Sequence, residues 1–69
     1  MRKTITQKEV NKLLVLQEKA SLLQKELDKI DADIQKMLGT KDENGRILDF
    51  LNLGQDVMVF LTDCGIKLK

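Results

Sequence analysis

The chain has 69 residues, with 12 lysines and arginines, 11 aspartates and glutamates, one cysteine and no histidine. The formal net charge of +1 provides no overall field to hold a polyphosphate, which disfavours nucleic-acid binding. A single cysteine excludes an intrachain disulfide, so we expect a reducing, cytoplasmic environment. No apolar stretch approaches the roughly 20 residues of a membrane span. The sequence therefore predicts a soluble single domain, residues 1–69, that does not enter a membrane.

Small size is the first constraint on the fold. A chain of this length buries only about 60% of its unfolded surface when it folds alone. Domains of this size usually depend on disulfides, on a structural metal or on oligomerisation. One cysteine and no histidine argue against the first two, so the composition predicts self-association.

After an N-terminal tail, residues 1–5, one long helix is predicted over residues 6–38, a stretch without glycine or proline. Thr6 and Glu9 have the spacing of a capping box, which places the first helical residue at Gln7. Gly39 stands where a left-handed residue would end the helix.

The predicted helix carries apolar residues at alternating spacings of three and four. A 3.5-residue repeat held over about four heptads predicts a left-handed coiled coil. Such a helix is about 50 Å long at 1.5 Å per residue, which is longer than any core that the rest of the chain could build. We therefore expect the seam to pair between chains. The residues expected at this oligomer interface are Leu13, Leu16, Ala20, Leu23, Leu27, Ile30, Ile34 and Met37.

Charged residues beside the seam favour an antiparallel dimer. In that orientation Lys12 would face Asp33, and Lys19 would face Glu26 of the partner helix. Each exposed pair contributes about 0.2–0.5 kcal/mol. Packing of the single seam alanine against a leucine favours the same orientation, because a parallel pair would stack alanine on alanine. The register stays open by one heptad, and so does the choice between a dimer and a dimer of dimers.

Four further apolar residues in the first half of this helix lie off the seam. They are Val10, Leu14, Val15 and Leu22. A two-stranded coiled coil would leave them uncovered, so we expect the C-terminal segment or additional helices to pack over them.

A polar loop, residues 39–45, leads to a β region over residues 46–69. The apolar run 57–61 contains two valines and a phenylalanine between turn-forming residues, a pattern typical of a strand. Residues 66–69 alternate with period two, and the four residues before them suit a hairpin. Residues 46–53 fit either a strand or a helix, and we prefer the strand. The predicted fold class is α+β: a coiled-coil helix (7–38) followed by a small antiparallel β-meander, assembled as an oligomer.

The chain has few residues that could carry catalysis. It has no histidine, tyrosine or tryptophan, so the usual base near neutral pH is missing, as are most transition-metal ligands. Cys64 has no histidine to activate it, and we interpret it as a structural thiol. An acidic cluster lacks the spacing of a calcium loop and is interpreted as a solvated face. It comprises Asp28, Asp31, Asp33, Asp42 and Glu43. We expect no enzymatic activity, cofactor or metal.

The sequence therefore predicts a non-enzymatic interaction protein, a homo-oligomer that binds, inhibits or scaffolds another protein. The alternative is an oligomeric binder of a small anionic ligand such as a nucleotide, because exposed amides at a helix N-terminus favour anions. A nucleic-acid-binding regulator is a third, less favoured hypothesis. Candidate anion-binding residues are Lys3, Lys8, Lys12 and Arg46.

Overall fold

A computed structural model describes residues 3–41 and 45–69, so the predicted tail 1–5 and loop 39–45 are described only in part. The described chain is mostly helical. Its elements are β1 (Thr4–Ile5), α1 (Gln7–Leu22), the 3-10 helix η1 (Gln24–Glu26), α2 (Leu27–Leu38), α3 (Arg46–Leu53), α4 (Val57–Asp63) and β2 (Lys67–Leu68).

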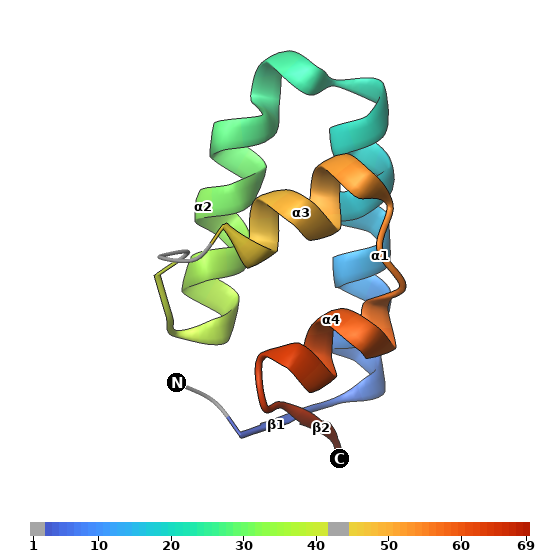
Figure 1. The fold of residues 1–69 in the computed structure, drawn as a ribbon, viewed down its shortest axis with the longest axis vertical. Helices are drawn as coiled ribbons and strands as arrows, with labels where there is room; N and C mark the ends of the chain where they lie inside the picture. The colour runs from blue at the N-terminus through green and yellow to red at the C-terminus, as the bar shows by residue number, and fades with distance from the viewer. Residues whose placement is uncertain (1–2, 42–44) are drawn as a thin grey trace.

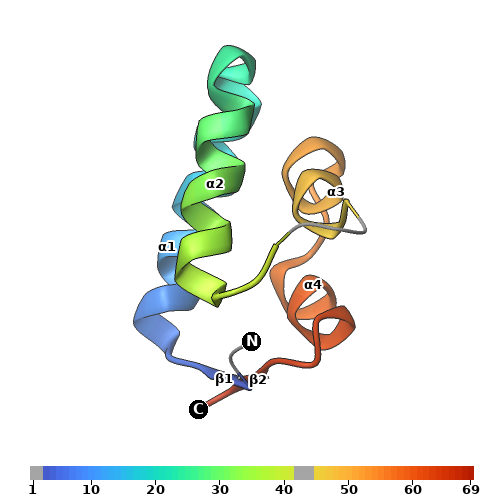
Figure 2. The ribbon, with the colours of Figure 1, turned by 90° about the vertical axis from the view of Figure 1, so that its left-hand side faces the viewer.

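The helices form two layers. α1 and α2 run antiparallel as a hairpin, and α3 crosses this pair (Figure 1). Seen from the side, α3 and α4 make up the second layer, and β1 and β2 meet at the end of the molecule away from the hairpin turn (Figure 2). All four helices therefore contribute to one core.

Both ends predicted for the long helix are confirmed. The Thr6 hydroxyl accepts a hydrogen bond from the Glu9 amide at 3.3 Å, and the Glu9 carboxylate accepts one from the Thr6 amide at 3.3 Å. This capping box starts α1 at Gln7. At the other end Gly39 has φ 66°, a left-handed conformation that glycine adopts without steric cost, and α2 ends at Leu38.

The prediction of one continuous coiled-coil helix between these ends is wrong, because the helix breaks at Leu23. There the backbone leaves the helical region, with φ −123° and ψ 65°. The Leu23 amide still donates to the Lys19 carbonyl at 2.7 Å, and its own carbonyl accepts from the Glu26 amide at 2.9 Å. The break therefore leaves few backbone groups without partners while it reverses the chain.

The break at Leu23 also overturns the predicted antiparallel coiled-coil dimer, because most residues of the predicted seam are buried within a single chain. The seam residues buried in this core are Leu13, Leu16, Ala20, Ile30 and Ile34. A net backbone hydrogen bond contributes about 0.5–1.5 kcal/mol, whereas full burial of one large aliphatic side chain contributes about 1.5–3 kcal/mol. Folding the helix back on itself buries several such side chains for the loss of a few hydrogen bonds.

The predicted antiparallel β-meander is also wrong, since residues 46–53 and 57–61 are helical. In α3 the buried residues Ile47, Phe50 and Leu51 lie on one helical face, which is the reading that the sequence left as the alternative. Gly54, at φ 63°, ends this helix.

α4 forms in spite of the β-branched residues in its first turn. The Asp56 carboxylate caps it by accepting from the Met58 amide at 2.8 Å. Phe60 of α4 stacks on Phe50 of α3, with ring centroids 4.6 Å apart. Burial of Phe60 and Leu61 in the common core overrides the local preference of valine for a strand.

A short strand does form near the C-terminus, but it pairs with a strand near the N-terminus and not with one that is close to it in the sequence. β2 pairs in parallel with β1, with Thr4 opposite Lys67. The Lys67 amide donates to the Lys3 carbonyl at 2.9 Å, and the Lys69 amide donates to the Ile5 carbonyl at 2.7 Å. The predicted hairpin is therefore replaced by a contact between the two ends of the chain.

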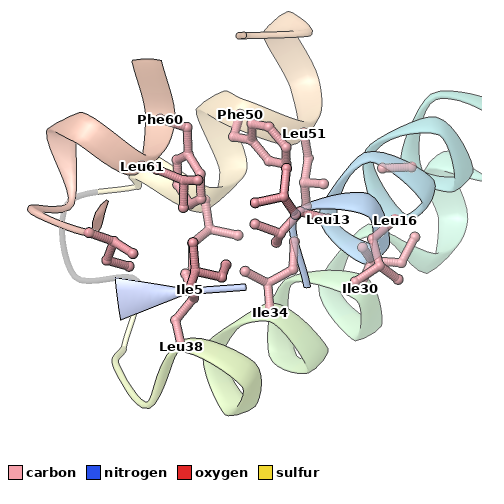
Figure 3. Packing of buried hydrophobic residues seen from close by; sticks show 14 residues of the cluster. Ile5, Leu13, Leu16, Ile30, Ile34, Leu38, Phe50, Leu51, Phe60 and Leu61 are labelled. Carbon is pink, nitrogen blue, oxygen red and sulfur yellow. The ribbon is translucent and has the colours of Figure 1, made fainter. Parts of the chain in front are cut away.

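The core lies between the two layers. The labelled side chains of α3 and α4 point toward those of α1, α2 and β1 (Figure 3). Residues from each of the four α-helices and from β1 are less than 10% exposed, among them Ile5, Leu13, Ile34, Phe50 and Phe60. A single copy of the chain therefore forms a connected hydrophobic core without a partner.

Candidate functional site

Four large aliphatic side chains outside this core are exposed around one part of the surface. Leu22 and Leu53 are each 77% exposed, Leu23 is 48% exposed and Leu14 is 43% exposed. Leu14 and Leu53 line one hollow, and Leu22 and Leu23 line a second hollow at the hairpin turn. The two hollows share the lining residues Ser21 and Gln24, so they lie next to each other. We call Leu14, Leu22, Leu23 and Leu53 the aliphatic surface.

The register of α1 determines which of its leucines are exposed. Leu13, Leu16 and Ala20 face the core, and residues one position away from this stripe turn outward, as Leu14 does. Leu22, the last residue of α1, points away from the core. Because the helix breaks at the next residue, Leu23 also leaves the buried seam.

Gln17 positions the other side of the first hollow. Its side-chain amide donates to the Phe50 carbonyl at 2.9 Å and to the Gln55 carbonyl at 2.8 Å. Phe50 is one of the last four residues of α3, whose carbonyls lack partners within that helix. The two bonds tie the C-terminal end of α3 to α1, and so place Leu53 across the groove from Leu14.

The groove between α1 and α3 is an open hollow of about 590 Å³. Its lining mixes apolar side chains with uncharged polar ones, and Glu18 is the single charged residue among them. The full lining is Leu14, Gln17, Glu18, Ala20, Ser21, Gln24, Leu51, Asn52, Leu53 and Gly54. A concave, mostly neutral surface that combines exposed leucines with uncharged polar groups suits a partner with both apolar and polar side chains better than a charged metabolite.

The remaining predicted interface residues have mixed positions. Leu27 and Met37 are partly buried against the core, whereas Leu23 is half exposed. The four charged residues predicted to pair across a dimer are all exposed, and within the described parts of the chain none of them forms an ion pair. They are Lys12, Lys19, Glu26 and Asp33.

The predicted anion-binding residues come from three elements. Lys3 precedes β1, and Lys8 and Lys12 lie in α1, all with exposed side chains. Arg46 begins α3 and donates to the Asp63 carbonyl at 2.7 Å, so its guanidinium caps the C-terminal end of α4. Arg46 therefore has a structural contact of its own.

The residues considered for catalysis or metal binding do not gather in the described chain. Cys64 lies half-buried at the end of α4. Asp31, predicted to lie on a solvated face, is instead buried, and its carboxylate accepts a hydrogen bond from the Gln35 side-chain amide at 3.3 Å. Residues 3–41 and 45–69 contain no group of three cysteine, aspartate or glutamate side chains that could hold a metal ion, and Asp42 and Glu43 of the predicted acidic face lie outside these ranges.

Part of the aliphatic surface could be found from the sequence and part could not. Leu14 and Leu22 were identified as apolar residues off the seam, but the expectation that the C-terminal segment covers them is wrong, since both remain exposed. Leu53 was missed because residues 46–53 were assigned to a strand. The helical spacing of Ile47, Phe50 and Leu51 is the signal that would have placed Leu53 off the buried face.

Neither the helices nor the comparisons provide a further functional assignment. None of the helices in the described part of the chain is both long enough and apolar enough to span a membrane. Comparisons with protein-family models, with curated proteins and with solved structures find no match to this chain.

Proposed function

We propose that this protein is a non-enzymatic protein-binding module that docks on another protein through the aliphatic surface, Leu14, Leu22, Leu23 and Leu53. The observation that carries the proposal is the exposure of these four leucines around two adjacent hollows. Isolated exposed leucines are common on monomeric proteins, but a contiguous group around a groove is typical of an interaction site.

The completeness of the core supports the same proposal. Fourteen hydrophobic residues form one buried cluster within the chain, so folding does not require the four leucines to be covered. Burying a large aliphatic side chain contributes about 1.5–3 kcal/mol, and this free energy stays available for binding a partner.

Site-specific photocrosslinking in cells that express the protein tests the proposal. A benzoylphenylalanine residue would replace Leu22 or Leu53, and in a matched control it would replace Lys29, an exposed residue of α2. We expect a discrete adduct with another protein from the two leucine positions and none from the control. Its mass would distinguish a different protein from a second copy of this chain.

Two results would count against this function. Adducts of equal yield from all three positions would indicate random collisions, and no adduct from either leucine position would indicate a surface without a partner. Circular dichroism of each labelled variant checks that the fold is kept, which is expected because the replaced side chains are exposed.

A further inference from the structure

The outer face of α1 carries a second regular pattern, distinct from the buried seam. Lys8, Lys12, Val15, Lys19 and Leu22 are spaced by four, three, four and three residues, which aligns them along one side of the helix. All five are exposed, with Val15 at 54% and Leu22 at 77%. We call these five residues the lysine–aliphatic row.

The charge of this row is not balanced by local ion pairs. Within residues 3–41 and 45–69, none of its three lysines forms an ion pair with an aspartate or glutamate. Single exposed lysines and valines are ordinary surface residues. Three lysines in line with two exposed aliphatic residues, at the spacing through which helices contact each other, form a surface that complements another helix.

We propose that the lysine–aliphatic row binds an acidic amphipathic helix of a partner protein. The apolar side of the partner helix packs on Val15 and Leu22, and its carboxylates lie beside Lys8, Lys12 and Lys19. The row spans about 20 Å at 1.5 Å per residue, which corresponds to about four turns of the partner helix. This inference rests on the proposed function, because Leu22 belongs both to the row and to the aliphatic surface.

Two other occupants match the row less well. Packing of two copies row against row is disfavoured, because it would bring three lysines of each copy together and like charges repel. A nucleic-acid duplex would satisfy the lysines but would leave Val15 and Leu22 without apolar contacts. An acidic amphipathic helix satisfies both kinds of side chain in the row.

The test is a selection from displayed amphipathic helices of about five turns. Each carries leucine, isoleucine or valine on one face and either glutamate or lysine, in equal proportion, at the flanking positions. Against the unmodified protein we expect enrichment of glutamate at these flanks. Against Lys8→Glu/Lys12→Glu we expect the preference to reverse to lysine. The matched control Lys29→Glu/Lys36→Glu, with the same change of charge on exposed residues of α2, should keep the preference for glutamate.

Binding of the selected helices then separates the possible outcomes. We expect Lys8→Glu/Lys12→Glu to weaken binding about tenfold, and Leu22→Ser to weaken it as well, with circular dichroism showing intact folds. Recovery of binders without a charge preference that still depend on Leu22 would overturn this inference and leave the proposed function standing. Binders insensitive to both Leu22→Ser and Leu53→Ser would count against both.

A nucleic-acid arm completes the experiment. A short DNA duplex is titrated against the unmodified protein and against Lys8→Glu/Lys12→Glu at low salt. Failure to recover any helix, together with lysine-dependent binding of the duplex, would replace the proposed helix with a phosphate backbone as the occupant. Failure to recover a helix without duplex binding would equally overturn the inference.

Discussion

Gln17 joins the two layers of the molecule by a polar contact within a largely apolar interface. Its side-chain amide serves two carbonyl oxygens, those of Phe50 and Gln55, which lie more than 30 positions away in the sequence. A carbonyl at the end of a helix that is shielded from water needs such a donor. One side chain of α1 therefore satisfies the end of α3 and fixes the entry to α4.

Replacement of Gln17 by glutamate should destabilise the protein by about 1–3 kcal/mol, because it removes two donors and brings a carboxylate toward two carbonyl oxygens. Urea unfolding followed by circular dichroism measures this change. The matched substitution Gln24→Glu affects an exposed glutamine in the same groove and should change stability by less than about 0.5 kcal/mol. Equal effects at both positions would show that the two hydrogen bonds contribute little.

At the scale of the elements, the break at Leu23 decides the architecture. Residues 7–22 and 27–38 both have good helical character, and no glycine or proline separates them. The 3-10 helix η1 turns the chain so that the apolar faces of α1 and α2 meet. Tertiary packing, and not a helix-breaking residue, therefore ends α1.

A proline at position 24 distinguishes this hairpin from a continuous helix. Gln24 is the first residue of η1, and the residue before it lies outside the helical region, so the geometry accepts proline. We expect Gln24→Pro to change the free energy of unfolding by less than about 1 kcal/mol, in either direction. In a continuous helix the same substitution would cost about 3 kcal/mol or more.

Asp33→Pro provides the control for this prediction, because Asp33 lies in the middle of α2 and is exposed. It should cost about 3 kcal/mol or more in thermal or urea unfolding. A comparable loss from Gln24→Pro would contradict the hairpin turn. Retention of stability by both variants would mean that α2 itself adds little to the fold.

At the scale of the whole molecule, the two termini close the core together. β1 and β2 are only two residues long, and such a short pair is not stable alone. Ile5 and Ile66, at their buried side, are 0% and 3% exposed. The Ile66 amide also donates to the Leu61 carbonyl at 2.9 Å, which joins this end to α4. The pairing therefore depends on the core that it covers.

Ile66→Ala should destabilise the protein by about 2–4 kcal/mol, because it leaves a cavity where the ends of the chain meet. Leu68→Ala, two residues further along and 43% exposed, should cost less than about 1 kcal/mol. Urea midpoints of the two variants provide the comparison. An equal loss from both would mean that burial of Ile66 contributes no more to this end of the molecule than the exposed side chain of Leu68.

Local interactions, between residues close together in the chain, could be predicted from the sequence. The capping box of Thr6 and Glu9 and the left-handed Gly39 depend on residues within a few positions of each other, and both occur as predicted. The identity of the seam residues as buried side chains was also correct for Leu13, Leu16, Ala20, Ile30 and Ile34. For the candidate site, the sequence indicated that Leu14 and Leu22 lie off this seam, but not that they stay uncovered.

Only the tertiary structure decided which segment packs against each apolar helix face. The same 3.5-residue repeat can pair with another chain or fold back on its own, and the repeat does not distinguish the two. Similarly, 46–53 and 57–61 have mixed local preferences, which burial of Phe50 and Phe60 against α1 and α2 resolves in favour of helices. The sequence by itself determined where the first and last turns of the hairpin lie and that five of its seam residues are buried, namely Leu13, Leu16, Ala20, Ile30 and Ile34. Only the packed structure decided that the helix turns back at Leu23, because that choice depends on contacts between residues distant in the chain.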